Sequence, residues 1–228
     1  TAQQGYFRTG NLVSPAGYPF GATARWLLLA VFTEAVRRQS REIDLGDSVT
    51  AFLRELGVAK EGRRIRAVHE QMARLLAASI RFSFRDHHLI AGANRSIASD
   101  YLLWRRQSGT RARGYAVLNK AVFRDLIRHP IPLDLGAIRA LRDCPLAIDL
   151  FVFFSFRLRA QTRPLRMRWV MLQSQLGADY RAAKEFARHA RLAMRRVHAV
   201  WPSLRTEFFR GGVTFFPPDS LPVKRLRR

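Results

Sequence analysis

Hydrophobic and polar positions alternate in a pattern that occurs twice along the chain, with an offset of roughly 120 residues. The first copy begins with a helical pattern over residues 22–39 and an alternating strand over 42–45. A helix from an N-cap at Asp47 to residue 56, ending at Gly57, comes next, and then a helix over 63–79. Strict alternation over 80–85 and a further apolar stretch from Leu89 predict a hairpin.

The second copy has the same order of elements. We predict a helix over residues 145–159, a strand over 165–168 and a helix over 169–176 that stops at Gly177. A long helix from Tyr180 to about Val200 follows, with Asp179 as its N-cap. The last element is a hairpin over 207–216, in which Gly211 and Gly212 are expected to supply the positive φ of a tight turn.

Helix, strand, helix, turn, longer helix and hairpin is the element order of a winged helix-turn-helix domain. Between the two copies we predict a strand over residues 115–118, a helix over 119–128 and a joint at the proline-marked residues 129–132. The sequence therefore predicts a helix-rich α+β protein with two tandem winged helix-turn-helix domains, residues 1–130 and 131–228.

The charge of the chain narrows the class of partner. Its 228 residues include 40 Lys and Arg against 17 Asp and Glu, a net charge of +23. Such an excess is typical of proteins that bind a polyanion, either nucleic acid or an anionic membrane surface. Both predicted domains are basic, +11 for residues 1–130 and +12 for residues 131–228. Of the 40 basic residues 36 are Arg, which fits a GC-rich genome as well as selection for the bidentate guanidinium group.

The helix that starts at Tyr180 carries basic residues at helical spacing on one side and apolar residues on the other. The basic residues are Arg181, Lys184, Arg188, Arg191 and Arg195. An ordinary solvated helix face is the alternative, but such faces interleave Glu for i,i+4 pairs, and Glu185 alone interrupts this one. We therefore interpret this face as the main DNA reader, with the residues nearest the N-terminus closest to base edges.

A weaker basic cluster opens the helix over residues 63–79. Arg63, Arg64 and Arg66 crowd its first turn, where a cationic group opposes the helix dipole. They either position phosphates or read bases, and the sequence leaves both open. In the predicted wings and loops, phosphate contacts are open to Arg81, Arg85, Arg210, the loop over residues 105–113 and the tail over 224–228.

Catalytic, metal and membrane signatures are missing from the sequence. No phosphate-binding GxxxxGKS/T loop is present, His87-His88 lacks the spacing of a metal-dependent nickase, and Tyr101 and Tyr115 have no expected activating neighbours. We expect no enzymatic activity, no cofactor and no metal. The lone Cys144 excludes an internal disulfide, and the most apolar stretch, residues 26–32, is far shorter than the ~20 residues that span a bilayer.

Several segments resemble the plasmid-encoded RepA family of replication initiators. They are residues 6–13 (YFRTGNLV), 40–48 (SREIDLGDS), 129–135 (HPIPLDL) and 145–150 (PLAIDL), and the likeness extends from Tyr6 to about Pro217. The resemblance implies a protein of the bacterial cytoplasm that binds repeated origin sequences (iterons), helps to open the origin and recruits host replication proteins. Tandem winged-helix initiators commonly interconvert between monomers that start replication and dimers that repress their own promoter.

Two functions remain open from the sequence. One is a sequence-specific plasmid replication initiator that binds double-stranded DNA at origin repeats, and the other is a winged-helix transcriptional regulator without initiator activity. In either case we expect the second domain to read the DNA and the first to supply phosphate contacts and any homodimer contact. Leu102, Leu103 and Trp104 are candidates for that dimer contact, or else they pack inside the first domain.

Overall fold

The chain divides into two compact units, residues 1–130 and residues 131–228. The computed structural model describes residues 2–9, 12–56, 62–85, 90–104, 113–131 and 133–218. Throughout these ranges helices alternate with small antiparallel sheets, so the prediction of a helix-rich α+β protein is confirmed. None of the described helices is long and apolar enough to cross a membrane.

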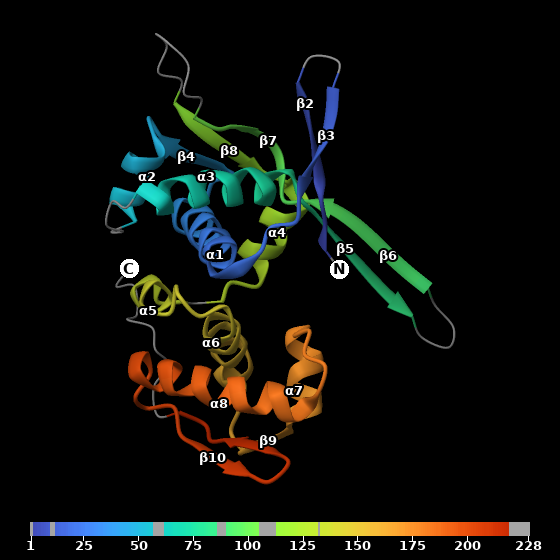
Figure 1. The fold of residues 1–228 in the computed structure, drawn as a ribbon, viewed down its shortest axis with the longest axis vertical. Coiled ribbons are helices and arrows are strands. Elements are labelled where there is room, and N and C mark those ends of the chain that lie inside the picture. Colours follow the sequence, from blue (N-terminus) through green and yellow to red (C-terminus); the bar gives the residue numbers. More distant parts are fainter. Residues whose placement is uncertain are drawn as a thin grey trace. The chain divides into compact units, whose positions relative to one another are not determined.

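The first unit contains long helices and several short strands (Figure 1). Its described helices are α1 (Gly21–Arg38), α2 (Val49–Glu55), α3 (Gly62–Ala77) and α4 (Lys120–Arg128). Its described strands are β1 (Ala2–Gln3), β2 (Gly5–Thr9), β3 (Leu12–Gly17), β4 (Glu42–Gly46), β5 (Ser79–Arg85), β6 (Ile90–Ser96), β7 (Ala98–Leu102) and β8 (Gly114–Leu118). Four of these strands, β1, β2, β3 and β7, come from regions in which the sequence pattern predicted no element.

Strand β4 pairs with the β7–β8 hairpin, in the order β4-β8-β7. The sequence pattern predicted the β5–β6 hairpin as the wing beside β4, and this prediction is wrong, because β5 and β6 form a separate sheet with β1. Trp104 explains the close approach of β8 to β4. Its indole Nε1 donates to the Gly46 carbonyl over 2.7 Å, and a Cβ at Gly114 would lie 2.7 Å from that same nitrogen.

Trp104 packs inside the first unit and is only 8% exposed. Its ring lies 5.8 Å from that of Phe52, and its carbonyl is hydrogen-bonded to the ring of His69 over 2.9 Å. Trp104 therefore belongs to the core and does not offer a dimer contact. Leu102 differs, because it is 41% exposed on β7.

Helix α2 is capped by Ser48 and not by Asp47. The Ser48 hydroxyl accepts from the Ala51 amide over 3.1 Å, as an N-cap one residue before the first helical position does. The end of α1 falls one residue earlier than expected, at Arg38, because Gln39 adopts a left-handed conformation with φ of 52°. Gly57, the expected end of α2, lies outside the described residues.

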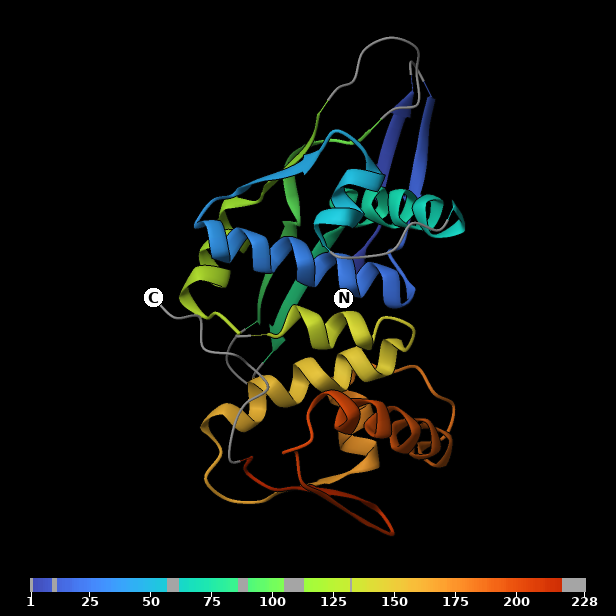
Figure 2. The same ribbon diagram turned by 90° about the vertical axis from the view of Figure 1, so that its left-hand side faces the viewer.

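The second unit packs its helices on one side of a three-stranded sheet (Figures 1 and 2). Its described elements are α5 (Leu135–Ala140), α6 (Pro145–Arg157), the 3-10 turn η1 (Leu158–Ala160), β9 (Leu165–Arg168), α7 (Trp169–Leu176), α8 (Ala183–Val200), β10 (Thr206–Phe209) and β11 (Gly212–Phe215). The core joins α6 to α8 and to the sheet. Phe154 stacks on Phe215 at 3.8 Å between ring centres, and Phe151 meets Trp201 edge to face at 6.0 Å.

The two units share one sheet topology. In each, a strand that follows a long helix (β4 after α1, β9 after α6) leads into two further helices, and that strand pairs with the last strand of a later hairpin. The sheet orders β4-β8-β7 and β10-β11-β9 are therefore the same arrangement. In the first unit, the β5–β6 hairpin is inserted between the second of these two helices and the strand β7.

Candidate nucleic-acid interface

Helix α8 buries one face in the core and presents a row of basic side chains on another. The buried positions are Phe186, Ala187, Ala190, Ala193, Met194 and Val197. Lys184, Arg188 and Arg195 are exposed and Arg191 is half-buried, and we call these four residues the α8 row. At about 100° per residue the four lie within a sector of about 60°, and at ~1.5 Å per residue the row is ~16 Å long. The predicted amphipathic pattern of this helix is thus confirmed.

Arg181 lies in the loop before α8 and not on the helix. The helix starts at Ala183 with Ala182 as N-cap and without a side-chain cap, so the prediction that Asp179 caps it is wrong. The loop is held by Tyr180, whose ring contacts those of Phe186 and His189 and whose carbonyl accepts from Gln173 Nε2 over 2.8 Å. Burial raises the pKa of the Tyr180 phenol. Arg181 itself is exposed next to this anchor.

The described carboxylates do not neutralise the α8 row. None of its four members, nor Arg181 or Arg210, lies within ion-pair distance of an Asp or Glu that the structure describes. In the first unit, by contrast, five arginines pair with nearby carboxylates: Arg37 and Arg38 with Glu34, Arg74 with Glu70, Arg95 with Asp125, and Arg113 with Asp44. The positive charge of α8 is therefore available to an external anion.

Arg191 connects α8 to the sheet. Its guanidinium carbon lies 5.0 Å from the ring centre of Trp169 and 5.6 Å from that of Phe208, and the two rings stack at 6.0 Å with an interplanar angle of 27°. These are cation–π distances. Arg191 therefore fixes α8 against α7 and β10, a packing role that its spacing in the sequence did not reveal.

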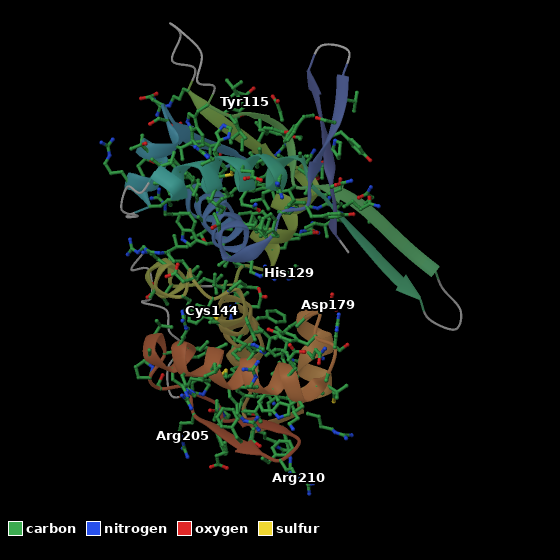
Figure 3. All side chains as sticks on the ribbon, viewed as in Figure 1. Tyr115, His129, Cys144, Asp179, Arg205 and Arg210 are labelled. Carbon is green, nitrogen blue, oxygen red and sulfur yellow. The ribbon has the colours of Figure 1, made fainter. Side chains whose placement is uncertain are left out.

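The β10–β11 hairpin presents Arg210 at its turn. Arg210 is exposed, and Figure 3 shows it at the end of the hairpin with Arg205 at the other end of β10. The prediction that Gly211 and Gly212 supply positive φ is wrong, since neither is among the glycines with positive φ. Gly212 is needed for another reason: a Cβ there would lie 2.0 Å from the Met167 carbonyl oxygen.

The sheet adds basic side chains that the site prediction did not include. Arg166 and Arg168 are exposed on β9, and Arg205 is exposed just before β10. The signal was present in the sequence, because the alternation of residues 165–168 places both β9 arginines on the side opposite the buried Met167.

The α3 helix of the first unit presents fewer described basic side chains to a nucleic-acid interface than α8 does. Arg66 is exposed, whereas the side chains of Arg63 and Arg64 lie outside the described part of the structure. The polar residues further along α3 hold the first unit together: Gln71 is buried and accepts from the Phe20 amide over 2.9 Å, and Arg74 lies 5.1 Å from the centre of the Phe20 ring. Also outside the described side chains are Arg81, Arg85, His87, His88, residues 105–112 and the tail over 224–228.

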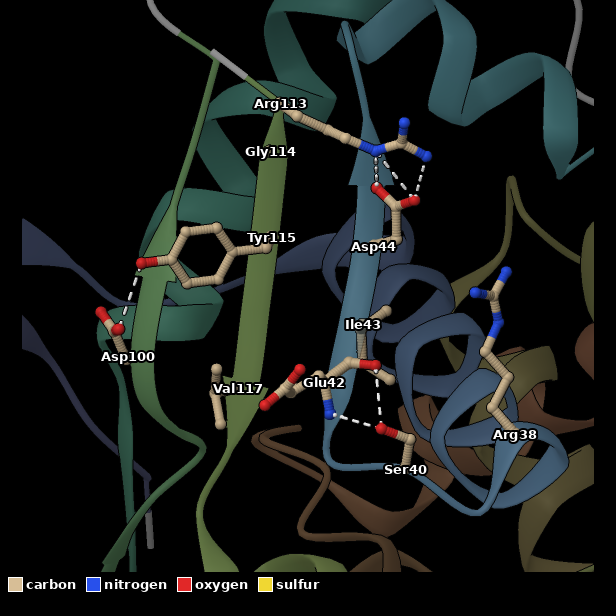
Figure 4. A pocket seen from close by; sticks show the side chains of 10 residues that line it. All are labelled: Arg38, Ser40, Glu42, Ile43, Asp44, Asp100, Arg113, Gly114, Tyr115 and Val117. Atoms are coloured by element: carbon tan, nitrogen blue, oxygen red, sulfur yellow. Dashed lines mark hydrogen bonds and ion pairs between the residues drawn. The ribbon is translucent and has the colours of Figure 1, made fainter.

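The outer face of the β4-β8-β7 sheet forms a hollow that is acidic at several points (Figure 4). Arg113 Nε donates to both carboxylate oxygens of Asp44 over 2.9 and 3.0 Å, and this contact lowers the Asp44 pKa to about 2. Tyr115 has a carboxylate neighbour after all, because its hydroxyl donates to Asp100 over 3.1 Å. This bond raises the Tyr115 pKa, which makes the phenolate harder to form. Glu42 is exposed on the same face.

The described residues include no group of three or more His, Cys, Asp or Glu side chains placed to hold a metal ion. Cys144 is half-buried at the N-cap of α6, as a small packing residue is expected to be.

Comparisons with known proteins agree with this architecture. The sequence profile of a family described as plasmid-encoded RepA protein matches residues 18–169. No curated protein matches the chain. The fold is similar to that of RctB domains 2 and 3: one crystal structure has a TM-score of 0.62 at 12% identity, covering 97% of this chain and 93% of the other. The selenomethionine derivative of these domains has a TM-score of 0.65 at 11% identity, covering 96% and 91%.

Proposed function

The chain belongs to the family of plasmid-encoded RepA proteins, and from this membership we propose that it initiates plasmid replication by binding double-stranded DNA at origin repeats. The observation that carries the proposal is the α8 row, a line of basic side chains without carboxylate partners among the described residues. A polyanion is the ligand that such a row favours, through the release of condensed counterions. Opening of the origin is part of the same proposal.

We propose that each unit is a winged helix-turn-helix domain. The support is the sheet order, in which the strand before the two helices pairs with the second strand of the hairpin that follows them. On this assignment α8 is the recognition helix and β10–β11 is the wing of the second unit. In the first unit α3 takes the place of the recognition helix and β7–β8 that of the wing.

Within this arrangement the residues divide by position. Lys184 and Arg188 stand on the first turns of α8, where a recognition helix approaches base edges, and Arg181 stands in the loop beside them. Arg195 lies farther along and Arg210 at the wing turn, where contacts go to phosphates. Arg66 contributes phosphate contacts from the first unit.

Binding through α8 is tested by electrophoretic mobility shift and footprinting on the DNA that flanks the coding region. The Lys184→Ala/Arg188→Ala variant should lose about tenfold or more in affinity, at ~1–3 kcal/mol for each base contact. Arg196→Ala is the matched control, because Arg196 is exposed on α8 outside the row. Equal affinity of wild type and double variant, both folded, would reject the α8 row as the reader.

A transcriptional regulator with the same two domains is the second candidate, and the DNA separates the two. Tandem direct repeats beside an AT-rich segment in the footprint would support initiation, whereas a single inverted repeat at a promoter would support regulation. The functional test supplies the chain in trans to a plasmid that has the origin but no initiator gene. Maintenance of that plasmid is the expected result, and repression without maintenance would favour the regulator.

Partners beyond DNA follow from the same proposal. An initiator of a bacterial plasmid acts in the cytoplasm together with host replication proteins, without enzymatic activity or a cofactor of its own. A homodimer that represses its own promoter would use the first unit, where Tyr6 and Val13 are 64% and 65% exposed on the β2–β3 hairpin. A dimer through α8 would bring like charges together, which costs several kcal/mol.

A further inference from the structure

The sheet of the second unit has one face that no helix of that unit covers (Figures 1 and 2). On the inner face, Met167, Val213 and Phe215 are buried. Because cross-strand partners point to the same side, the register places Arg166, Thr214 and Glu207 together on the opposite face. By the same rule Arg168, Gly212 and Phe209 form the neighbouring row of that face.

Two arginine–phenylalanine pairs lie on this side of the sheet. The Arg166 guanidinium carbon is 4.2 Å from the centre of the Phe209 ring, and that of Arg205 is 5.2 Å from the centre of the Phe216 ring. The Phe216 amide donates to the Arg205 carbonyl over 3.0 Å, which continues the β10–β11 ladder by one pair. We call Arg166, Arg168, Arg205, Phe209 and Phe216 the outer sheet face.

Gly212 shapes this surface. The Phe209 ring lies over Gly212, where a Cβ would come within 2.6 Å of the ring carbon Cζ. The missing side chain at Gly212 therefore leaves room for the Phe209 ring beside β11, with the Arg166 guanidinium over the ring. The three arginines have no ion pair with any described carboxylate, although Glu207 is exposed on the same face.

The basic and aromatic character of this face does not follow from the fold. The sheet of the same topology in the first unit carries Glu42 and Asp44 at the outward positions of its first strand, and Asp100 on its last hairpin (Figure 4). The second unit has Arg166 and Arg168 at the outward positions of its first strand. Since both sheets are built alike, the fold itself does not require arginines and phenylalanines at these outward positions.

We propose that the outer sheet face binds single-stranded DNA. Guanidinium groups and aromatic rings that lie next to each other both offer planar surfaces on which unpaired bases stack, while Arg168 takes a phosphate. A duplex keeps its bases stacked inside and presents only phosphates and groove edges, so it makes little use of such planes. The two pairs stand about four residues apart along β11, or ~14 Å, so one strand crossing the sheet reaches both.

The inference deepens the proposed function and rests on it, because opening an origin creates the unpaired strand that this face would hold. The α8 row stands on a helix that contacts the inner side of the sheet, where Arg191 lies over Phe208, whereas the outer sheet face is on the opposite side. A duplex on α8 therefore leaves the outer sheet face accessible. One unit would then hold duplex repeats and an adjacent opened strand on two different surfaces.

The test uses the whole chain and a labelled oligothymidine of about 20 nucleotides, long enough to exceed one single-strand site. Binding is followed by fluorescence anisotropy at about 0.15 M salt, in parallel with a duplex that carries the footprinted repeat. The decisive variant is Arg166→Lys/Arg205→Lys, which keeps both charges but removes both guanidinium planes. We expect affinity for the single strand to fall about tenfold and affinity for the duplex to change less than about twofold.

Matched control variants distinguish an effect specific to this face from the effect of replacing any exposed arginine or aromatic residue. Arg124→Lys/Arg128→Lys makes the same exchange at exposed positions of α4, and Phe156→Leu removes a 58% exposed ring from α6, so both should bind like wild type. Phe209→Trp supplies an independent readout, because a base that stacks on the new indole quenches its fluorescence. Saturating oligothymidine should therefore quench Phe209→Trp more than wild type.

The proposal would be overturned if wild type bound no oligothymidine, if the double lysine variant kept full single-strand binding, or if that variant lost equal affinity for duplex and single strand. The last would assign the face to the duplex footprint. Failure of the proposed function has a different signature, namely wild type that binds oligothymidine but no duplex from its own replicon. Loss of single-strand binding only in Lys184→Ala/Arg188→Ala would place the site on α8 and also contradict the inference.

Discussion

Replacing Arg191 with alanine distinguishes its packing role from a DNA contact. Arg191 is the member of the α8 row that lies over two aromatic rings, at 5.0 Å from Trp169 and 5.6 Å from Phe208. Its alkyl stem is half-buried, so the substitution removes packing as well as charge. Trp169 Nε1 is buried and has no hydrogen-bond partner among the described residues, so no hydrogen bond holds the indole in place once the guanidinium is lost.

The magnitude follows from the geometry. A cation–π contact contributes ~0.5–1 kcal/mol at a partly exposed site, so the two contacts together contribute ~1–2 kcal/mol. A loss of this size lowers the melting temperature of a domain of about 100 residues by ~5–10 °C. Because the contacts join α8 to α7 and β10, the loss should fall on the second unit.

Urea denaturation followed by circular dichroism and tryptophan fluorescence measures this loss. Arg195→Ala is the control, since Arg195 is exposed one turn further along the same row and should change the free energy of unfolding by less than ~0.5 kcal/mol. In DNA binding the order should reverse, with Arg195→Ala flattening the log–log salt slope by about one unit. Equal stability of the two variants would refute the reasoning for Arg191.

Three further outcomes are expected. Duplex affinity should fall by ~10³–10⁵ between 50 and 200 mM salt if about 6–10 phosphates are contacted, and a slope shallower than about −3 in titrations would contradict engagement of both units. Burial lowers the His198 pKa, so the unfolded state binds its proton first and the protein loses stability as the pH falls from about 7 to 5; melting curves should show less of this loss in His198→Gln. Gly212→Ala should cost ~3 kcal/mol in urea titrations, because the new Cβ meets the Met167 carbonyl oxygen, whereas Gly211→Ala should cost little.

Local sequence patterns predicted the helices and strands of the second unit well, because residues within or next to each element determine where it begins and ends. The bounds of β9 and α7 agree with the prediction, since Met167 is the buried residue of a short alternation and Gly177 ends α7 in a left-handed conformation with φ of 59°. The helical period of 3.6 residues likewise predicted which apolar residues of α8 are buried.

The pairing of strands that are far apart in the sequence could not be predicted from local patterns. Alternation over residues 80–85 correctly predicted a strand and its hairpin, but alternation does not say which sheet a hairpin joins. The partner of β4 is β8, with Ile43 opposite Ala116, and this choice depends on Trp104 and Gly114 filling the space beside Leu45. Such contacts appear only when the chain is folded.

The start of α8 shows why the site was predicted only in part. Asp179 is a good N-cap residue by type, but the half-buried Tyr180 ring, which packs on Phe186, keeps the chain in a loop for two more residues, so Arg181 is not on the helix. The partners of Arg191 come from α7 and β10, so helical spacing alone could not separate it from Arg195.

The two units have nearly the same net charge but differ in how much of their positive charge is paired with carboxylates. This difference bears on which unit binds DNA. The units are almost equally basic by composition, at +11 and +12. In the first, however, one described carboxylate on each of α1, α3, α4 and β4 pairs with arginine. A paired guanidinium group neutralises a DNA phosphate less effectively, so that fewer counterions leave the DNA. In the second, the α8 row and the outer sheet face keep their charge on two separate surfaces. Composition therefore favours a polyanion as the partner, and the pattern of ion pairs supports our proposal that the second unit is the part that binds DNA.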